Sequence, residues 1–237
     1  IKVQDTSITD YTGKHAFAEL LQNDPKKVDA KLYQRVSPVI VYDLNQDSLP
    51  EIILAGCILV YWNQGIGQFL HKPMLENPIM PLGEAGILSD FNGDGHLDFI
   101  STGKEDGLLR LWTGNAVGQF TAKPSVCFHG KYENPHTMTA ADIDLDGDLD
   151  LFVGQWKQPY LSGSMPTPNY DANDGYPDTL LLNDGVGQFT DGTESAGLAT
   201  KRNRRTYSAS FADLDGDHDL DLFAVCAFSG LDLYSND

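Results

Sequence analysis

Short apolar runs alternate with tight polar turns along most of the chain, and this alternation predicts β-strands joined by hairpins. Four of the turns are acidic, and each stands between two β-prone runs. The runs before them cover residues 38–42, 84–88, 136–140 and 207–211, and the runs after them begin at residues 52, 99, 151 and 222. The four stretches therefore read as copies of one unit rather than as unrelated hairpins.

A second signature follows three of the acidic turns. Residues 61–69, 112–120 and 182–189 each end in Gly-Gln-Phe. Glycines that close a tight turn before an aromatic residue are typical of a hairpin whose next strand is anchored by the ring. The acidic hairpin and the glycine turn together predict four strands per repeat of about 40–50 residues, which is the size of a propeller blade. The predicted fold class is all-β, a β-propeller of four-stranded blades, of which the chain holds about four.

Some stretches lie outside the repeat. Residues 1–36 are interpreted as an N-terminal extension, with a short helix over 16–22 and a strand that helps to close a ring, and residues 37–237 as the blades. Residues 156–178 are rich in Pro, Gly and Tyr and predict an inserted surface loop. The last copy of the second signature opens at residue 233 and stops before its glycines, so we expect the natural chain to continue.

The chain is strongly acidic, with 34 Asp and Glu against 16 Lys and Arg and a net charge of −18. Such a field repels phosphate, which argues against binding to nucleic acid or to an anionic membrane. No run of 18 apolar residues is present, so no membrane insertion is expected. The three cysteines lack CxxC spacing, which argues against a zinc or c-type haem site. Cys57 and Cys226 end apolar runs and are expected to be small buried hydrophobes, with a disulfide as the alternative.

The acids are concentrated in four nine-residue turns, residues 43–51, 90–98, 142–150 and 213–221, which we call acid loops 1 to 4. Calcium takes six to eight oxygen ligands, mostly carboxylates with a backbone carbonyl. Side chains at positions 1, 3, 5 and 9 and the carbonyl at position 7 would surround one point. The candidate ligands are Asp43, Asn45, Asp47 and Glu51; Asp90, Asn92, Asp94 and Asp98; Asp142, Asp144, Asp146, Asp148 and Asp150; and Asp213, Asp215, Asp217, Asp219 and Asp221.

Two other interpretations of the acid loops are an EF-hand and a polar turn without metal. An EF-hand needs a Glu at position 12 and flanking helices, but position 12 is Leu54, Ser101, Val153 or Ala224 and the flanks are β-prone. Polar turns without metal also favour Asp, Asn and Gly. Four or five carboxylates within nine residues repel one another unless a cation lies between them, however, and this favours calcium at up to four sites.

The four copies differ in their predicted strength. Acid loops 3 and 4 carry four acids at ligand positions and should bind calcium most tightly, whereas acid loop 2 has Asn92 in place of one acid. Acid loop 1 is the weakest, with Asn45, with Ser48 at position 6 and with Glu51 at position 9. His218 takes position 6, where histidine tolerates a left-handed backbone, and both His218 and His96 (at position 7) are interpreted as turn residues rather than metal ligands.

The combination of Asp-x-Asp-x-Asp-Gly-x-x-Asp loops with Asn-x-Gly-x-Gly-x-Phe turns resembles the FG-GAP/VCBS repeat family, which includes the head of integrin α chains. Residues 183–197 followed by 208–217 look most like its cartilage-acidic-protein (ASPIC/UnbV-associated) branch. The resemblance covers residues 37–237. It implies six to eight blades, calcium in the acid loops and an extracellular or periplasmic location. Gly114 and Ala116 depart from the pattern of the glycine turn, as acid loop 1 departs from that of the metal loop.

Three classes of function fit such a chain. The first is a non-enzymatic module that binds a protein or glycan, with Trp156, Tyr160, Tyr170 and Tyr176 as the possible ligand loop. The basic segment 201–205 is interpreted as a solvated turn, with contact to an acidic partner as the alternative. The second class is a propeller enzyme of the polysaccharide lyase or dehydratase type, although no catalytic motif is present. The third is a structural subunit of a larger extracellular or periplasmic assembly.

Overall fold

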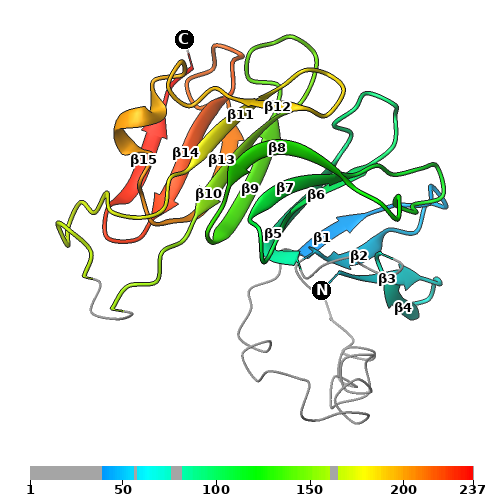
Figure 1. Ribbon diagram of the computed structural model, residues 1–237. Coiled ribbons are helices and arrows are strands. Elements are labelled where there is room, and N and C mark those ends of the chain that lie inside the picture. Colours follow the sequence, from blue (N-terminus) through cyan, green and yellow to red (C-terminus); the bar gives the residue numbers. More distant parts are fainter. Residues whose placement is uncertain (1–38, 56–57, 76–81, 161–164, 237) are drawn as a thin grey trace.

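The computed structural model describes residues 39–55, 58–75, 82–160 and 165–236, and almost all of its regular structure is β (Figure 1). The strands are β1 Val39–Tyr42, β2 Glu51–Leu54, β3 Leu59–Asn63, β4 Phe69–Pro73, β5 Leu82–Ser89, β6 Asp98–Gly103, β7 Leu108–Trp112, β8 Ser125–Lys131, β9 Pro135–Ala141, β10 Asp150–Gln155, β11 Thr179–Asn183, β12 Phe189–Asp191, β13 Thr206–Ala212, β14 Asp221–Cys226 and β15 Gly230–Tyr234. A 3-10 helix, η5, covers Leu198–Lys201. The predicted N-terminal extension and Cys57 lie outside the described residues.

The strands form four antiparallel sheets, each built from strands that are consecutive in the chain. Their orders are β1-β2-β3-β4, β5-β6-β7-β8, β12-β11-β10-β9 and β13-β14-β15, and we call them sheets 1 to 4. The all-β class is therefore confirmed, and so is the four-stranded repeat in sheets 1 to 3. Sheet 4 has three strands within the described part of the chain.

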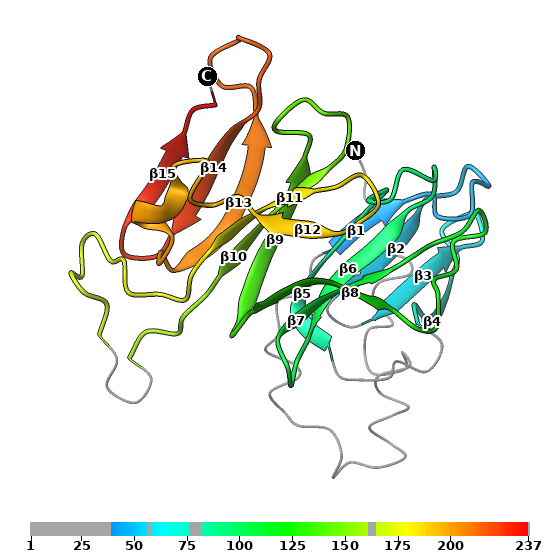
Figure 2. The same cartoon turned by 45° about the horizontal axis from the view of Figure 1, so that its top comes forward.

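The sheets follow one another around an arc, a propeller-like arrangement that both views show (Figures 1 and 2). The first strands of sheets 2, 3 and 4 lie side by side, since β9 contacts both β5 and β13. Each acidic loop joins the first strand of its sheet to the second. The arrangement therefore brings the four acid loops to equivalent places in successive sheets.

Hydrogen-bond registers show that the repeats correspond residue by residue. The residue after each acid loop pairs with a residue near the end of the third strand. These pairs are Ile52 with Tyr61, Phe99 with Trp112, Leu151 with Leu181, and Leu222 with Tyr234. The four sheets thus share one register, which allows any position in one sheet to be compared with its equivalents.

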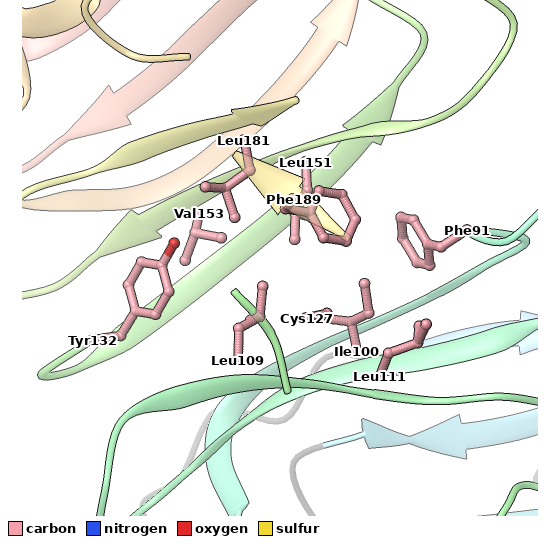
Figure 3. Close-up of a cluster of buried hydrophobic side chains, with 10 residues drawn as sticks. All are labelled: Phe91, Ile100, Leu109, Leu111, Cys127, Tyr132, Leu151, Val153, Leu181 and Phe189. Carbon is pink, nitrogen blue, oxygen red and sulfur yellow. The ribbon is translucent and has the colours of Figure 1, made fainter. Parts of the chain in front are cut away.

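The hydrophobic core lies between sheets, in three clusters. Side chains alternate across a strand, so Phe99 in β6 enters the cluster shared with sheet 1, whereas its neighbour Ile100 enters the one shared with sheet 3. The cluster between sheets 2 and 3 includes Leu109, Leu151 and other residues of both sheets (Figure 3). A third cluster lies between sheets 3 and 4. Each sheet is therefore held by its neighbours.

The two cysteines in the described residues are free thiols in these cores. Burial raises the pKa of Cys127 to about 12 and that of Cys226 to about 11. The thiolate is the reactive form, so neither sulfur is activated, and the expectation that Cys226 is a buried hydrophobe is confirmed. No helix among the described residues has the length and apolar character needed to cross a membrane.

Candidate metal centres in the acid loops

The first residue of each acid loop organises the turn through its carboxylate. In acid loop 1, Asp43 accepts hydrogen bonds from the backbone N–H groups of Asp47 at 3.0 Å and Ser48 at 2.8 Å. The equivalent bonds to Asp90 and Asp142 form in acid loops 2 and 3. In acid loop 4 the donors to Asp213 are at positions 4 and 6. These bonds curl the backbone around the point where position 1 presents its oxygens.

Positions 4 and 6 of every acid loop have a left-handed backbone. The residues are Gln46 and Ser48, Gly93 and Gly95, Leu145 and Gly147, and Gly216 and His218, with φ between 55° and 100° in each case. His218 at φ 83° confirms that histidine occupies such a turn position. Two left-handed residues two positions apart let alternate side chains turn toward one centre, as the ligand pattern requires.

The ninth residue of each acid loop is a buried carboxylate, at most 2% exposed. In every loop it accepts a hydrogen bond from the N–H at position 2, at 2.8–3.2 Å. In sheets 2, 3 and 4, its other oxygen accepts a hydrogen bond from a backbone N–H near the end of the third strand of the same sheet. The donors are Gly114 in sheet 2, Asn183 in sheet 3 and Asn236 in sheet 4. The ninth carboxylate therefore ties the acid loop to its sheet.

In acid loops 1 to 3, burial makes the ninth carboxylate costly to ionise. It raises the pKa of Glu51 and Asp98, and it raises the pKa of Asp150 to about 6, against the opposing effect of backbone hydrogen bonds. A cation beside a buried carboxylate favours its charged form. The ninth position is thus suited to a metal cation, because the positive charge of the cation would stabilise the ionised carboxylate.

Two acid loops bring three carboxylates together. In acid loop 3, oxygens of Asp142, Asp144 and Asp146 lie within 4.8 Å of one another, and in acid loop 4 the same holds for Asp213, Asp215 and Asp221. Oxygens that share one Ca²⁺ at 2.3–2.6 Å are at most about 5 Å apart, so both groups fit this ion. Asp148, Asp150, Asp217 and Asp219 lie outside these two groups.

An amide at position 3 distinguishes acid loops 1 and 2. The side-chain amide of Asn45 donates to Asp47 at 3.0 Å, and that of Asn92 donates to Asp94 at 3.1 Å. Each amide compensates part of the charge at position 5. In acid loops 3 and 4 the residue at position 3 is an aspartate, whose ionised carboxylate cannot donate a hydrogen bond. The negative charges at positions 3 and 5 of those loops are therefore not compensated in this way. The geometry thus parallels the predicted order of strength.

Asp148 stands at position 7 of acid loop 3, where its carboxylate is a candidate oxygen donor beside the backbone carbonyl. One of its carboxylate oxygens is buried and accepts no hydrogen bond from the described residues. Desolvation and then the neighbouring carboxylates, Asp146 first, raise its pKa. An unpartnered buried carboxylate oxygen beside three others is a second sign that the loop suits a cation.

The four aromatic residues proposed as a ligand loop do not share one surface. Trp156 stacks on Tyr207 of β13 at 4.1 Å between ring centroids, and His136 lies against both rings. Tyr176 lies beside the ammonium group of Lys157. Tyr160 is 61% exposed and Tyr170 is 80% exposed. Of the four, Tyr160 and Tyr170 are thus the exposed rings, and Tyr207 is the ring that sequence reasoning missed.

The basic segment 201–205 is not the solvated turn that the sequence suggested, because Arg204 is 5% exposed and Arg205 is fully buried. Every Lys or Arg of the segment forms an ion pair. The pairs are Lys201 with Asp232, Arg202 with Asp191, Arg204 with Asp171 and Asp232, and Arg205 with Asp174. Two of the partners, Asp171 and Asp174, belong to the 156–178 insertion. The segment therefore fastens that insertion to sheet 4.

A family model described as FG-GAP-like repeat matches residues 90–153 and 170–224, which together make up half of the chain. No curated protein matches the sequence. Three solved structures have a distant likeness. The first is an Agrocybe aegerita lectin described as recognising non-reducing terminal N-acetylglucosamine, with 14% identity and a TM-score of 0.40 over 86% of this chain and 67% of that chain. The second is BBS1N in complex with ARL6DN, with 10% identity and a TM-score of 0.42 over 81% of this chain and 51% of that chain. The third is the V. cholerae biofilm matrix protein Bap1, with 18% identity and a TM-score of 0.35 over 80% of this chain and 35% of that chain. This chain spans about half of the second and a third of the last.

Proposed function

Because the chain belongs to the FG-GAP-like repeat family, we propose that it is a calcium-stabilised β-propeller module that binds a protein or a glycan outside the cytoplasm. The observation that carries the calcium part is the pair of carboxylate triads in acid loops 3 and 4. The shared geometry of all four acid loops supports up to four ions, with acid loop 1 the weakest. Within the family, we propose a relation to the ASPIC/UnbV-associated branch, whose motifs residues 183–197 and 208–217 resemble.

The chain's own residues would hold the ion in a preformed frame. Position 1 fixes the turn, positions 3 and 5 supply oxygens, and position 9 anchors the loop to its sheet. Bound calcium supplies the positive charge that relieves the repulsion between these carboxylates. Because the ion binds the folded loops and not the unfolded chain, it should stabilise the fold according to its concentration relative to Kd.

Calcium titration by calorimetry, together with thermal unfolding in calcium and in EDTA, tests this proposal. We expect at least two Ca²⁺ per chain and a higher Tm in calcium. Asp144→Asn and Asp215→Asn should each remove one of the tighter sites and part of the Tm gain, whereas Glu105→Gln, an exposed acid outside the loops, should leave both unchanged. No heat of binding, with equal Tm values in calcium and EDTA, would rule the proposal out.

The partner is proposed to be a protein or a glycan, contacted without catalysis. The exposed Tyr160 and Tyr170 support a contact on the 156–178 insertion, because exposed aromatic side chains are efficient anchors. Incubation with acidic polysaccharides, with and without chelator, tests the non-catalytic part. Release of unsaturated uronate would move the protein to the lyase class. Stable recovery within a larger complex would instead favour the structural subunit.

A further inference from the structure

A cleft of about 540 Å³ lies between sheets 1 and 2, in the range of volumes that hold small ligands. One wall comes from sheet 1 and includes Trp62 of β3 and Lys72 of β4. The other comes from the segment that precedes β8 and includes Gln119 and Phe120. Asn45 of acid loop 1 also lines the cleft. The cleft is separate from the 156–178 insertion, which belongs to sheet 3.

The tryptophan in this cleft is specific to sheet 1. The common register makes Tyr61 equivalent to Trp112, Leu181 and Tyr234, so the next residue, Trp62, is equivalent to Thr113, Leu182 and Ser235. A large aromatic ring at this position therefore distinguishes one sheet from the three others. Since the repeat does not require it, it calls for a local explanation.

Trp62 is packed on one side and available on the other. It lies against the hydrophobic cluster between sheets 1 and 2, and it also lines the cleft. Its indole N–H is buried and finds no acceptor among the described residues. Among the described residues, packing and not a hydrogen bond thus positions the ring, and the part of it that lines the cleft is available to a ligand.

Two polar side chains that line the cleft with Trp62 have no hydrogen-bond partner in the described ranges. Lys72 and Gln119 are exposed, and neither side chain forms a hydrogen bond or ion pair with another described residue. A flat aromatic surface with a few hydrogen-bonding groups at its edge is suited to a sugar ring, whose C–H face is apolar and whose hydroxyls point outward. The net charge of −18 disfavours a carboxylated sugar at this surface.

From these features we infer that the cleft between sheets 1 and 2 binds a neutral pyranose unit of a glycan, stacked on Trp62 and hydrogen-bonded by Lys72 and Gln119. This inference rests on the proposed binding function and names a site for it other than the 156–178 insertion. Calcium in acid loop 1 would hold Asn45 and that part of the cleft in place.

Tryptophan fluorescence tests the inference, because the chain has three tryptophans and Trp112 is buried. The full chain, in calcium, would be titrated with glucose, mannose and galactose hexasaccharides and with hexagalacturonate as the acidic counterpart. We expect a saturable change with at least one neutral hexasaccharide and weaker binding of hexagalacturonate. Trp62→Ala should lower the affinity more than about 10-fold, as for a central aromatic anchor.

Two milder variants and a matched control keep the test decisive if Trp62→Ala disturbs the fold. Lys72→Met and Gln119→Ala, which each remove the donor, should each weaken binding by about 3- to 10-fold, the amount expected for one hydrogen bond. Trp156→Phe should retain both affinity and fluorescence change, whereas Trp62→Phe should lose the change.

Three results would overturn the cleft as the sugar site. They are unchanged binding by Trp62→Ala, equal or tighter binding of hexagalacturonate, and no saturable change with any neutral hexasaccharide. Binding that survives Trp62→Ala but is lost with Tyr170→Ala would place the sugar on the insertion. That outcome would refute the cleft and leave the proposed binding function standing.

Discussion

At the scale of single residues, the acid loops contain backbone conformations that their side chains do not favour. Leu145 has φ 61° and its side chain is 65% exposed, so it occupies a left-handed position with little burial in return. The left-handed region costs a residue with a Cβ about 1–2 kcal/mol, which glycine avoids. Acid loops 2 and 4 have glycine at this same position, as Gly93 and Gly216.

We therefore expect Leu145→Gly to stabilise the protein by up to about 1 kcal/mol, after the extra chain entropy of glycine is subtracted. Urea unfolding in calcium would measure the change. Leu233→Gly is the control, because Leu233 is similarly exposed but lies within β15, where glycine weakens the strand. A loss of stability of the same size in both variants would contradict the role of the left-handed backbone.

Asp178 illustrates a buried acid outside the acid loops. Its carboxylate accepts hydrogen bonds from the backbone N–H of Gln155 and the hydroxyl of Thr206, and desolvation raises its pKa to about 7. The folded protein thus holds a proton there that the unfolded chain releases near pH 4. The resulting stability is full below about pH 4 and is lost as the pH rises through 7.

The variant Asp178→Asn should consequently flatten the dependence of stability on pH between 4 and 7. In calcium, the free energy of unfolding of the natural protein should fall across this window by more than that of Asp178→Asn. Glu105→Gln controls for the loss of one negative charge on an exposed side chain. Parallel curves for the natural chain and Asp178→Asn would show that this carboxyl does not supply the pH dependence.

At the scale of elements, side chains at the end of the third strand join neighbouring sheets. The amide of Asn183 in β11 donates to the carbonyl of Phe91 in acid loop 2 and to that of Leu149 in acid loop 3. Asn236 after β15 donates in the same way to the carbonyl of Ile143 in acid loop 3. Buried carbonyls are left unsatisfied when such a donor is removed.

Asn183→Ala should destabilise the protein by about 2–3 kcal/mol, because two carbonyls lose their donor at a buried site. Asn115→Ala is the matched control. Asn115 is exposed, and within the described part of the chain its side chain bonds only to N–H groups in its own turn, those of Val117 and Gln119. Equal losses in the two variants, measured by urea unfolding, would show that the contact between sheets adds nothing.

The strands and acid loops could be predicted from the sequence because they are local and repeated. A nine-residue turn carries its own ligands and its own left-handed positions, and four copies confirm one another. The ion pairs of segment 201–205 could not be predicted in this way. Arg205 and Asp174 are 31 residues apart and belong to a region without a repeated counterpart, so their contact depends on how the insertion folds back.

The same reason explains the revised view of the aromatic loop. Trp156 is near Tyr160, Tyr170 and Tyr176 in the sequence, yet its ring stacks on Tyr207, in the next sheet. Composition identified residues capable of binding but not which of them the fold uses for packing. The contact between β13 and the residue after β10 is set by the arrangement of whole sheets.

At the scale of the whole molecule, each core cluster lies between two neighbouring sheets, so none of the described sheets has a core of its own. Trp112 lies in the core between sheets 1 and 2, Cys127 in the core between sheets 2 and 3, and Cys226 in the core between sheets 3 and 4. Each of these residues can therefore serve as a probe of one core. Loss of one sheet would expose apolar side chains of its neighbour. The described sheets should therefore unfold together.

The expected result is one urea midpoint for tryptophan fluorescence and for the labelling of both thiols, measured in a Cys57→Ser background. Cys127→Ser and Cys226→Ser in that background would assign each labelling signal. If Cys226 became reactive at a lower urea concentration than the fluorescence change, sheet 4 would be an independent unit, contrary to the expectation.

The side-chain amide of Asn183 should couple the binding of calcium at two acid loops. It holds the backbone of acid loops 2 and 3 at once, so an ion that tightens one loop also restrains the other. Such an influence is reciprocal by thermodynamic necessity. With calcium bound as proposed, the isotherm should be steeper than that of independent sites, and Asn183→Ala should return its Hill coefficient toward one.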